Sequence, residues 1–329
     1  MAGSPGWWRG ARFGSPAGGI SPCRDPSGRS PGGILAPRCP GRLDPALDNG
    51  LWGRPGRGGS LLPAGGSACG GDRLTIGLQL FTLFDAPDLR QARRVLSVQP
   101  HYDDNDIAAG GTLAALADAG ADLIYLTVTD DLVGVVDPHL PDDQAAAQLK
   151  HEQMAAARII GIRQQEWLGF PDAGDYNYFE LRRQVIRAIR LYRPDFLFTC
   201  DPWLPYEAHR DHIQTGLAVA EASYLHAMPR LKSDPLVDAA YQPYELAGVA
   251  FYFSQAANTS VDIGSTFERK HQAVACYQAQ FTTAEMARLL ERLEAAEKKA
   301  GAEAGFVVGE RFKVLRPAQL HLDTNAWKS

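Results

Sequence analysis

The chain has 329 residues, of which 45% are hydrophobic, and its formal net charge at pH 7 is −5. A chain of this length and composition can bury a substantial core in one large domain or in two smaller ones. The acidic balance argues against a nucleic-acid partner bound through its phosphate backbone, and no run of about eighteen apolar residues predicts a membrane span.

The first 71 residues differ in composition from the rest of the chain. They contain 19 of the 33 glycines and 10 of the 22 prolines. Eight Arg against three Asp give this segment a charge of +5, which leaves −10 for the remaining residues. Because such a composition buries too little apolar surface to fold, we expect residues 1–71 to form a disordered extension.

From about residue 93, short apolar runs alternate with helical patterns. In chain order the sequence predicts a strand at 95–98, a helix at 106–119, a strand at 123–128, a helix at 144–160, a short strand around Trp167, a helix at 178–192, a strand at 196–199 and a helix at about 211–226. This alternation is typical of parallel strands with helices on both faces. We therefore expect a Rossmann-like, doubly wound α/β fold with a mostly parallel sheet.

The pattern is looser beyond residue 230. It predicts a strand at 248–253, a helix at 267–279 and a late strand at 306–315. The stretch Thr282-Thr283-Ala284-Glu285 has the spacing of a capping box and is expected to open another helix. In doubly wound sheets, ligands bind at the carboxyl ends of the strands, near a change in strand order.

The cysteine pattern and the first residues of the chain indicate the cellular compartment. Five cysteines without a CxxC pair support neither a disulfide framework nor a cysteine zinc site. No secretory apolar segment follows Met1. These features predict a cytoplasmic protein.

A first polar cluster, His101-Tyr102-Asp103-Asp104-Asn105-Asp106, directly follows the strand predicted at 95–98. Three carboxylates within four residues repel one another unless a cation or the positive end of a helix neutralises them. Asp106 is expected to cap the helix that follows, and helix capping without a metal stays an alternative explanation of the whole cluster.

A second polar cluster, His209-Arg210-Asp211-His212, follows the strand predicted at 196–199. Because both clusters follow neighbouring strands at matching ends, the fold can bring them together. Two neutral imidazoles and one carboxylate leave positions open for water and substrate, as in catalytic metal sites. A bound Zn²⁺ lowers the pKa of its water to about 7, and a further Asp can take the proton. The clusters therefore predict a hydrolytic site with Zn²⁺ or another divalent ion such as Fe²⁺.

The two clusters resemble the motifs of the LmbE-like, or PIG-L, family of zinc-dependent N-acetylglucosaminyl deacetylases. "PHYDDND" is similar to the family's (A/P)HPDDE motif, and "HRDH" is similar to its HPDH motif. "HYDDNDIAAGGT" is similar to the H-x-D-D-x-E-I-x-x-G-G-T form of bacillithiol-pathway and chitobiose deacetylases. Three further segments, "HEQMAAARIIGI", "WLGFPDAGDY" and "KHQAVACYQAQF", extend the resemblance. An LmbE-like deacetylase domain is thus expected at 93–315, with a C-terminal tail at 316–329.

The resemblance implies a role for each clustered side chain. Three residues are implied to bind the metal: His101, Asp104 and His212. Asp103 is implied to be the general base that activates the bound water. His209 is implied to be protonated and to face the tetrahedral intermediate, with Asp211 orienting it. Together they could supply the nucleophile, the oxyanion stabilisation and the leaving-group proton that amide hydrolysis needs.

The chain departs from the family pattern at several positions. Tyr102 and Arg210 replace the prolines of the two motifs, and Asp106 replaces a Glu. "TDDLVG" at 129–134 stands where many relatives have T-x-G-E-x-G, a loop that helps to shape their sugar pocket. The resemblance therefore indicates the reaction more clearly than the identity of the sugar. Three more residues are candidates for substrate binding, with solvated loop positions as the alternative: Asp131, Tyr206 and Glu207.

Two other classes of protein fit parts of the pattern. Non-haem Fe(II) oxygenases also bind their metal through two His and one carboxylate, and His101-x-Asp103 has their H-x-D spacing. These enzymes are, however, generally jelly rolls of antiparallel strands. A non-catalytic Rossmann-like ligand-binding domain would need a phosphate loop, and "AAGGTLA" lacks G-x-G-x-x-G. The expected partner is a small N-acyl amino sugar or glycoconjugate, with no nucleic acid and no membrane. Assembly into a homo-oligomer is left open.

Overall fold

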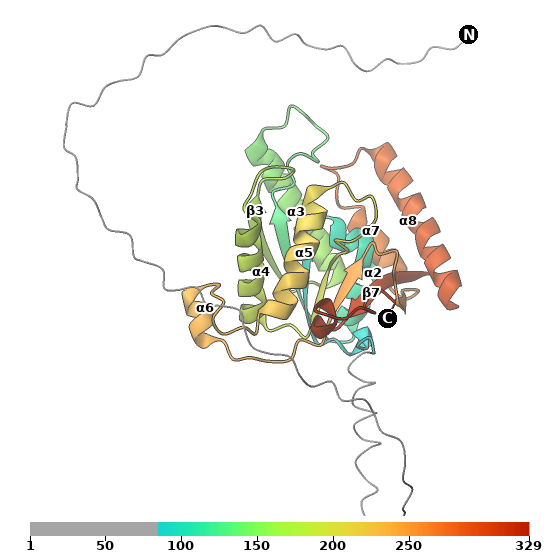
Figure 1. Ribbon diagram of the computed structural model, residues 1–329. Helices are drawn as coiled ribbons and strands as arrows, with labels where there is room; N and C mark the ends of the chain where they lie inside the picture. Colours follow the sequence, from blue (N-terminus) through green and yellow to red (C-terminus); the bar gives the residue numbers. More distant parts are fainter. Residues whose placement is uncertain (1–84, 329) are drawn as a thin grey trace, which may run out of the picture. The chain divides into compact units, whose positions relative to one another are not determined.

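The computed structural model describes residues 85–328, and the prediction made for residues 1–71 lies outside this range. The described residues form a sheet with the strand order β3-β2-β1-β4-β5-β7-β6 (Figure 1). Its strands are β1 (Arg94–Gln99), β2 (Asp122–Thr129), β3 (Gln164–Phe170), β4 (Phe196–Cys200), β5 (Gly248–Tyr252), β6 (Thr259–Asp262) and β7 (Gly309–Leu315). The pairs among β1 to β5 are parallel, whereas β7 is antiparallel to β5 and β6 is antiparallel to β7. The prediction of a mostly parallel α/β sheet is confirmed.

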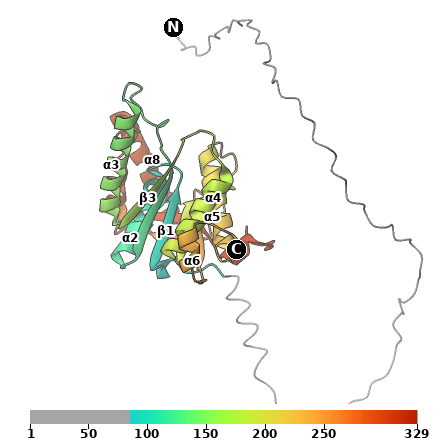
Figure 2. The same ribbon diagram turned by 90° about the vertical axis from the view of Figure 1, so that its left-hand side faces the viewer.

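Helices cover both faces of the sheet (Figure 2). One layer contains α2 (Asp104–Asp118), α3 (Asp142–Ile160), α7 (Phe267–Val274) and α8 (Thr283–Ala304), and the other contains α4 (Tyr178–Tyr192), α5 (Arg210–Leu225) and α6 (Pro235–Ala240). Buried side chains form two apolar clusters, one under each layer. Short 3₁₀ turns, η1 (Leu89–Gln91) and η2 (Pro317–Leu320), flank this unit. No helix within residues 85–328 is both long and apolar enough to cross a membrane.

Several helix ends follow from local signals in the sequence. α3 ends at Gly161, whose φ of 103° lies in the left-handed region that glycine adopts without strain. α4 begins after Asn177, whose side chain accepts hydrogen bonds from two N–H groups of the first turn. The predicted range 178–192 is confirmed, and Thr282 and Glu285 form the predicted capping box of α8.

The strand order reverses between β1 and β4, which are adjacent in the sheet. β1, β2 and β3 are joined through α2 and α3 on one face, whereas β4 is reached through α4 on the opposite face. Chain segments leaving β1 and β4 therefore turn away in opposite directions, and they leave a space at the carboxyl ends of these strands. Both polar clusters of the sequence lie in these two segments.

The structure differs from the sequence predictions most clearly beyond residue 250. The helix predicted at 267–279 is too long, because α7 ends at Val274 and the following residues form turns. These turns bury Tyr277 beneath the start of α2, a long-range contact that helical periodicity does not reveal. β6 was not predicted, since four residues at a sheet edge are too few to give a periodic signal.

Glu310 of β7 takes part in a buried ion pair and also contacts α2. Nζ of Lys270 lies 2.7 Å from Oε1 of Glu310 and 2.6 Å from Oε1 of Glu297, and all three side chains are buried. The Glu310 carboxylate also accepts hydrogen bonds from the N–H groups of Gly111 (3.0 Å) and Thr112 (2.8 Å) in α2. The helix that begins with the first polar cluster is thus held at its middle by one carboxylate.

Replacing Glu310 with Ala should lower the free energy of unfolding by about 3–5 kcal/mol, because it leaves a buried lysine with one partner fewer. Urea unfolding followed by circular dichroism would measure the change. Glu303→Ala is the matched control, since Glu303 pairs with Arg311 at the surface and such a pair contributes about 0–1 kcal/mol. Equal losses in the two variants would mean that the buried pair does not hold α2.

Candidate metal centre and active site

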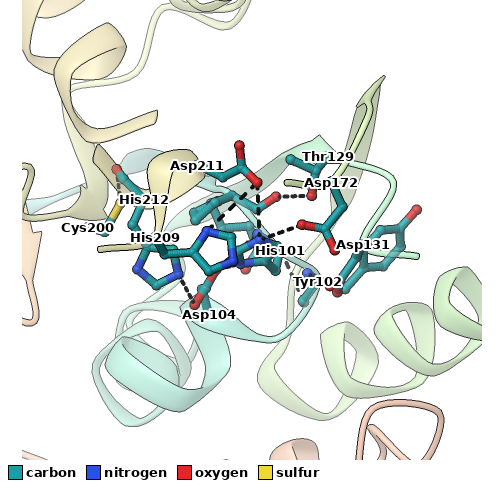
Figure 3. A network of polar contacts seen from close by, with 12 residues as sticks. His101, Tyr102, Asp104, Thr129, Asp131, Asp172, Cys200, His209, Asp211 and His212 are labelled. Atoms are coloured by element: carbon teal, nitrogen blue, oxygen red, sulfur yellow. Dashed lines mark hydrogen bonds and ion pairs between the residues drawn. The ribbon is translucent and has the colours of Figure 1, made fainter. Parts of the chain in front are cut away.

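Two segments at the carboxyl end of the sheet carry the clustered residues. The loop after β1 carries His101 and Asp103, and Asp104 opens α2. The segment after β4 carries His209, and His212 lies in the first turn of α5. Figure 3 shows the three imidazole rings side by side. The ring centroids of His101 and His209 are 4.5 Å apart, and those of His101 and His212 are 5.3 Å apart. The fold brings the two clusters together.

Three of these side chains have the spacing of ligands to one ion. Nδ1 of His101 lies 3.2 Å from Oδ2 of Asp104, and Nε2 of His212 lies 3.4 Å from Oδ1 of the same carboxylate. Ligand atoms about 2.0–2.1 Å from a tetrahedral Zn²⁺ are about 3.3–3.4 Å apart, so both distances fit a shared ion. Two imidazoles and one carboxylate also leave a position open for water, as catalytic sites do. Donor chemistry and spacing both fit a divalent metal.

The charge around His101 also fits a bound cation. Its Nε2 lies 3.3 Å from Oδ1 of Asp172, and within residues 85–328 neither of these buried atoms has a hydrogen-bond partner. Burial lowers the pKa of His101, but the contacts with Asp104, Asp172 and Asp211 outweigh burial and raise this pKa well above its usual value. Buried carboxylates in this number require positive charge beside them. A divalent ion would supply it.

A second set of side chains shares His101 with the first. Its ligand atoms also lie within 4.8 Å of one another, and its members are His101, Asp172, His209 and Asp211. Both oxygens of Asp211 already accept hydrogen bonds at 2.8 Å, one from the N–H of Ala173 and one from the hydroxyl of Tyr176. Asp211 therefore has less capacity for an ion than Asp104, and the first set is the better metal site.

Asp103 immediately precedes α2 but does not cap it. Its side chain is buried and accepts no hydrogen bond from another residue of the described chain, 85–328. Burial, and then the neighbouring Asp104 carboxylate, raise the pKa of Asp103 above its usual range. A buried carboxylate with a raised pKa is suited to taking and returning a proton.

His209 is the most exposed of the three imidazoles, and Asp211 is nearly inaccessible beside it. Burial lowers the pKa of His209, and the imidazoles of His101 and His212 lower it further. Burial would raise the pKa of Asp211, but its contacts with His101, Ala173 and Tyr176 lower it to about 2. The neutral form of His209 is thus favoured before substrate binds, and a negative charge on a substrate oxygen would raise this pKa again.

The three residues proposed for substrate binding lie in different surroundings. Asp131 is buried, and its Oδ2 accepts hydrogen bonds from the Tyr102 N–H (3.0 Å) and from Nε2 of Gln280 (2.8 Å). Tyr206 is fully exposed and has a positive φ of 68°. Glu207 faces His212, with 3.5 Å between Oε2 and Nδ1. Only Glu207 joins the cluster directly, whereas Asp131 supports the loop that carries His101.

The prediction that Asp106 caps the helix is wrong. α2 begins at Asp104, and Asp106 is fully buried in its first turn. Its two carboxylate oxygens accept hydrogen bonds from the hydroxyls of Tyr125 and Tyr277. Burial raises the pKa of Asp106 to about 6. Asp106 therefore holds the start of α2 against the core, through two tyrosines that lie far away in the sequence.

Two residues near the imidazoles were not singled out from the sequence. Asp172 follows β3, and its Oδ2 accepts the Val133 N–H (3.1 Å) while its Oδ1 faces His101. Its position after a parallel strand was the available signal, because such residues share the edge where both clusters lie. Phe253 stacks on the ring of His212, with 7° between the ring planes. No local pattern marks Phe253, which only follows an apolar strand.

These features define a class of protein: a Rossmann-like α/β domain with a candidate metal centre of two His and one Asp at its topological switch point. A family model described as "PIG-L: GlcNAc-PI de-N-acetylase" matches residues 96–223. Diacetylchitobiose deacetylase of Thermococcus kodakarensis is 34% identical over 189 residues, which cover 57% of this chain and 70% of that protein. The chain belongs to the PIG-L, or LmbE-like, family.

A solved structure and a second relative agree with this assignment. N,N'-diacetylchitobiose deacetylase from Pyrococcus horikoshii has a TM-score of 0.70 and 29% identity, and the match covers 78% of this chain and 97% of that chain. A 1D-myo-inositol 2-acetamido-2-deoxy-alpha-D-glucopyranoside deacetylase of Kineococcus radiotolerans is 28% identical over 170 residues. The match covers 42% of this chain and about half, 47%, of that relative. The family is one of enzymes that hydrolyse amide bonds, and metal dependence is typical of it. The fold excludes the jelly-roll architecture of the oxygenase alternative.

Proposed function

We propose that the protein is a metal-dependent N-deacetylase that removes an acetyl group from an N-acetylated amino sugar or glycoconjugate. The observation that carries this proposal is the convergence of His101, Asp104 and His212 at ligand spacing, beside the buried carboxylate of Asp103. The activities of these relatives supply the substrate class, since each of them is a deacetylase of an acetamido sugar. The cytoplasmic location stays a prediction.

In this proposal, Nδ1 of His101, the Asp104 carboxylate and Nε2 of His212 would hold the metal, and Zn²⁺ is the ion that suits this set of donors best. Such an ion, when bound, lowers the pKa of a water and polarises the substrate carbonyl. The protein's part is to hold these ligands in place: the backbone N–H of His101 donates to Oδ2 of Asp104 at 2.9 Å, which fixes this carboxylate beside the His101 ring. A water molecule is the nucleophile, so no covalent acyl-enzyme is needed.

The remaining steps are carried by side chains beside the metal set. Asp103 takes a proton from the attacking water as the new C–O bond forms, and then returns it to the amine nitrogen as the C–N bond breaks. The products are acetate and a free amino sugar. His209 donates a hydrogen bond to the oxygen that becomes negative. Asp211, held by Ala173 and Tyr176, places its carboxylate 3.8 Å from Nδ1 of His209 and acts on this ring through its charge.

Purified protein should contain about one equivalent of zinc and should release acetate from N,N'-diacetylchitobiose or N-acetylglucosamine. Removal of the metal with a chelator should abolish this release, and added Zn²⁺ should restore it. Metal content by elemental analysis and acetate by an enzymatic assay would check both statements. Full acetate release by protein that holds no metal would overturn the proposal.

A further inference from the structure

The Nδ1 edge of the His212 ring faces a carboxylate outside the three-residue metal set. Oε2 of Glu207 lies 3.5 Å from Nδ1, while Nε2 on the opposite edge of the ring lies 3.4 Å from Oδ1 of Asp104. Both side chains are largely buried, with exposed fractions of 16% for His212 and 19% for Glu207. One edge of this imidazole therefore faces the metal set, and the other edge faces Glu207.

The remaining faces of His212 are also constrained. Phe253 lies parallel to the ring, with 6.3 Å between centroids. Its backbone has a φ of 57°, which is uncommon for an aromatic residue and typical of positions that the surrounding structure holds in place. Sγ of Cys200 donates to the backbone oxygen of His212 at 3.1 Å. Phe253 thus covers one face of the ring, and Cys200 holds the backbone that carries it.

The backbone around Glu207 is fixed as well. Its N–H donates to the oxygen of Leu204 at 3.2 Å, and its Oε1 accepts the N–H of His209 at 2.7 Å. One carboxylate thus contacts both the segment that carries His209 and the ring of His212. These contacts of Glu207 span the start of α5, where both histidines lie.

The chemistry of an imidazole ligand explains how the contact between Glu207 and Nδ1 of His212 could affect metal binding. A neutral histidine that binds a metal through Nε2 must keep its proton on Nδ1, and an acceptor at Nδ1 selects this tautomer. We propose that Glu207 is a positioning residue, which accepts the Nδ1 proton of His212 and presents Nε2 to the metal. This inference rests on the proposed function, and it replaces the substrate-binding role that the sequence suggested for Glu207.

Zinc affinity tests the inference directly. The apo forms of the wild type, Glu207→Gln, Glu207→Ala and the control Glu245→Ala would compete with a chromophoric chelator for Zn²⁺. Loss of an outer carboxylate weakens metal binding by about 10- to 100-fold, so Glu207→Ala should lose this much affinity. Glu207→Gln keeps one oxygen acceptor and should lose less. Glu245 is an exposed carboxylate, and its removal should change nothing.

The tautomer of His212 gives a second readout, which a merely structural role would not move. In the zinc-loaded wild type, imidazole nitrogen NMR should show that Nδ1 of His212 carries a proton. In zinc-loaded Glu207→Gln, the chemical shift of this nitrogen alone should change. Wild-type zinc affinity in both Glu207 variants would overturn the inference and leave the proposed function standing. A wild type that binds no zinc would overturn both. Should Glu207→Ala fail to fold, Glu207→Gln decides the question.

Discussion

Replacement of Asp103 by Asn should lower kcat by about 10²- to 10⁴-fold, while zinc content and KM stay close to the wild-type values. Asn has the shape of Asp, but its amide cannot take a proton from water at neutral pH. The Asp103 carboxylate is buried, accepts no hydrogen bond from another residue in the range 85–328 and has a raised pKa. Its replacement therefore removes the proton transfer without breaking a hydrogen bond to another residue.

Asp143→Asn is the matched control for this variant. Asp143 is an exposed carboxylate in the first turn of α3, so its replacement should leave kcat and metal content unchanged. Steady-state acetate release would give kcat and KM, and elemental analysis would give the zinc content of each variant. If Asp103→Asn lost its zinc and Asp104→Asn kept it, the roles given to the two neighbouring aspartates would have to be exchanged.

The parts of the site that the sequence could predict are those encoded locally. His101, Asp103 and Asp104 follow one apolar strand, and His209 and His212 follow another. Parallel strands in a doubly wound sheet place such residues at a common edge, so strand periodicity alone made their meeting foreseeable. The helix boundaries with Asn177 and Gly161 were equally accessible, because caps act through the nearest backbone groups.

The parts that could not be predicted depend on contacts between distant segments. Asp106 looked like a helix cap because of its place in the sequence, but Tyr125 and Tyr277 draw its carboxylate into the core. Glu207 was a candidate for substrate binding, with a solvated loop position as the alternative, but its side chain turns towards His212. A sequence pattern gives the element on which a residue lies, whereas the direction of a polar side chain depends on which partners the tertiary fold offers.

Replacement of His212 or His209 should show which of the two candidate ligand sets that share His101 binds the metal. Replacing His212 with Ala should weaken zinc binding by more than about 100-fold, which exceeds the loss expected for an outer residue. Replacing His209 with Ala should leave zinc bound and lower kcat by about 10²- to 10³-fold, the usual effect of losing one donor to an oxyanion. Zinc titration and acetate release on both variants would separate binding from catalysis.

This pair of variants distinguishes the two sets because each histidine belongs to only one of them. If zinc sat between His101, Asp172, His209 and Asp211, the result would be reversed, with His209→Ala losing the metal. The geometry argues against that outcome, since both oxygens of Asp211 already accept hydrogen bonds from Ala173 and Tyr176. An ion there would have to compete with these donors, whereas at Asp104 it would occupy the gap between the carboxylate and two imidazole nitrogens.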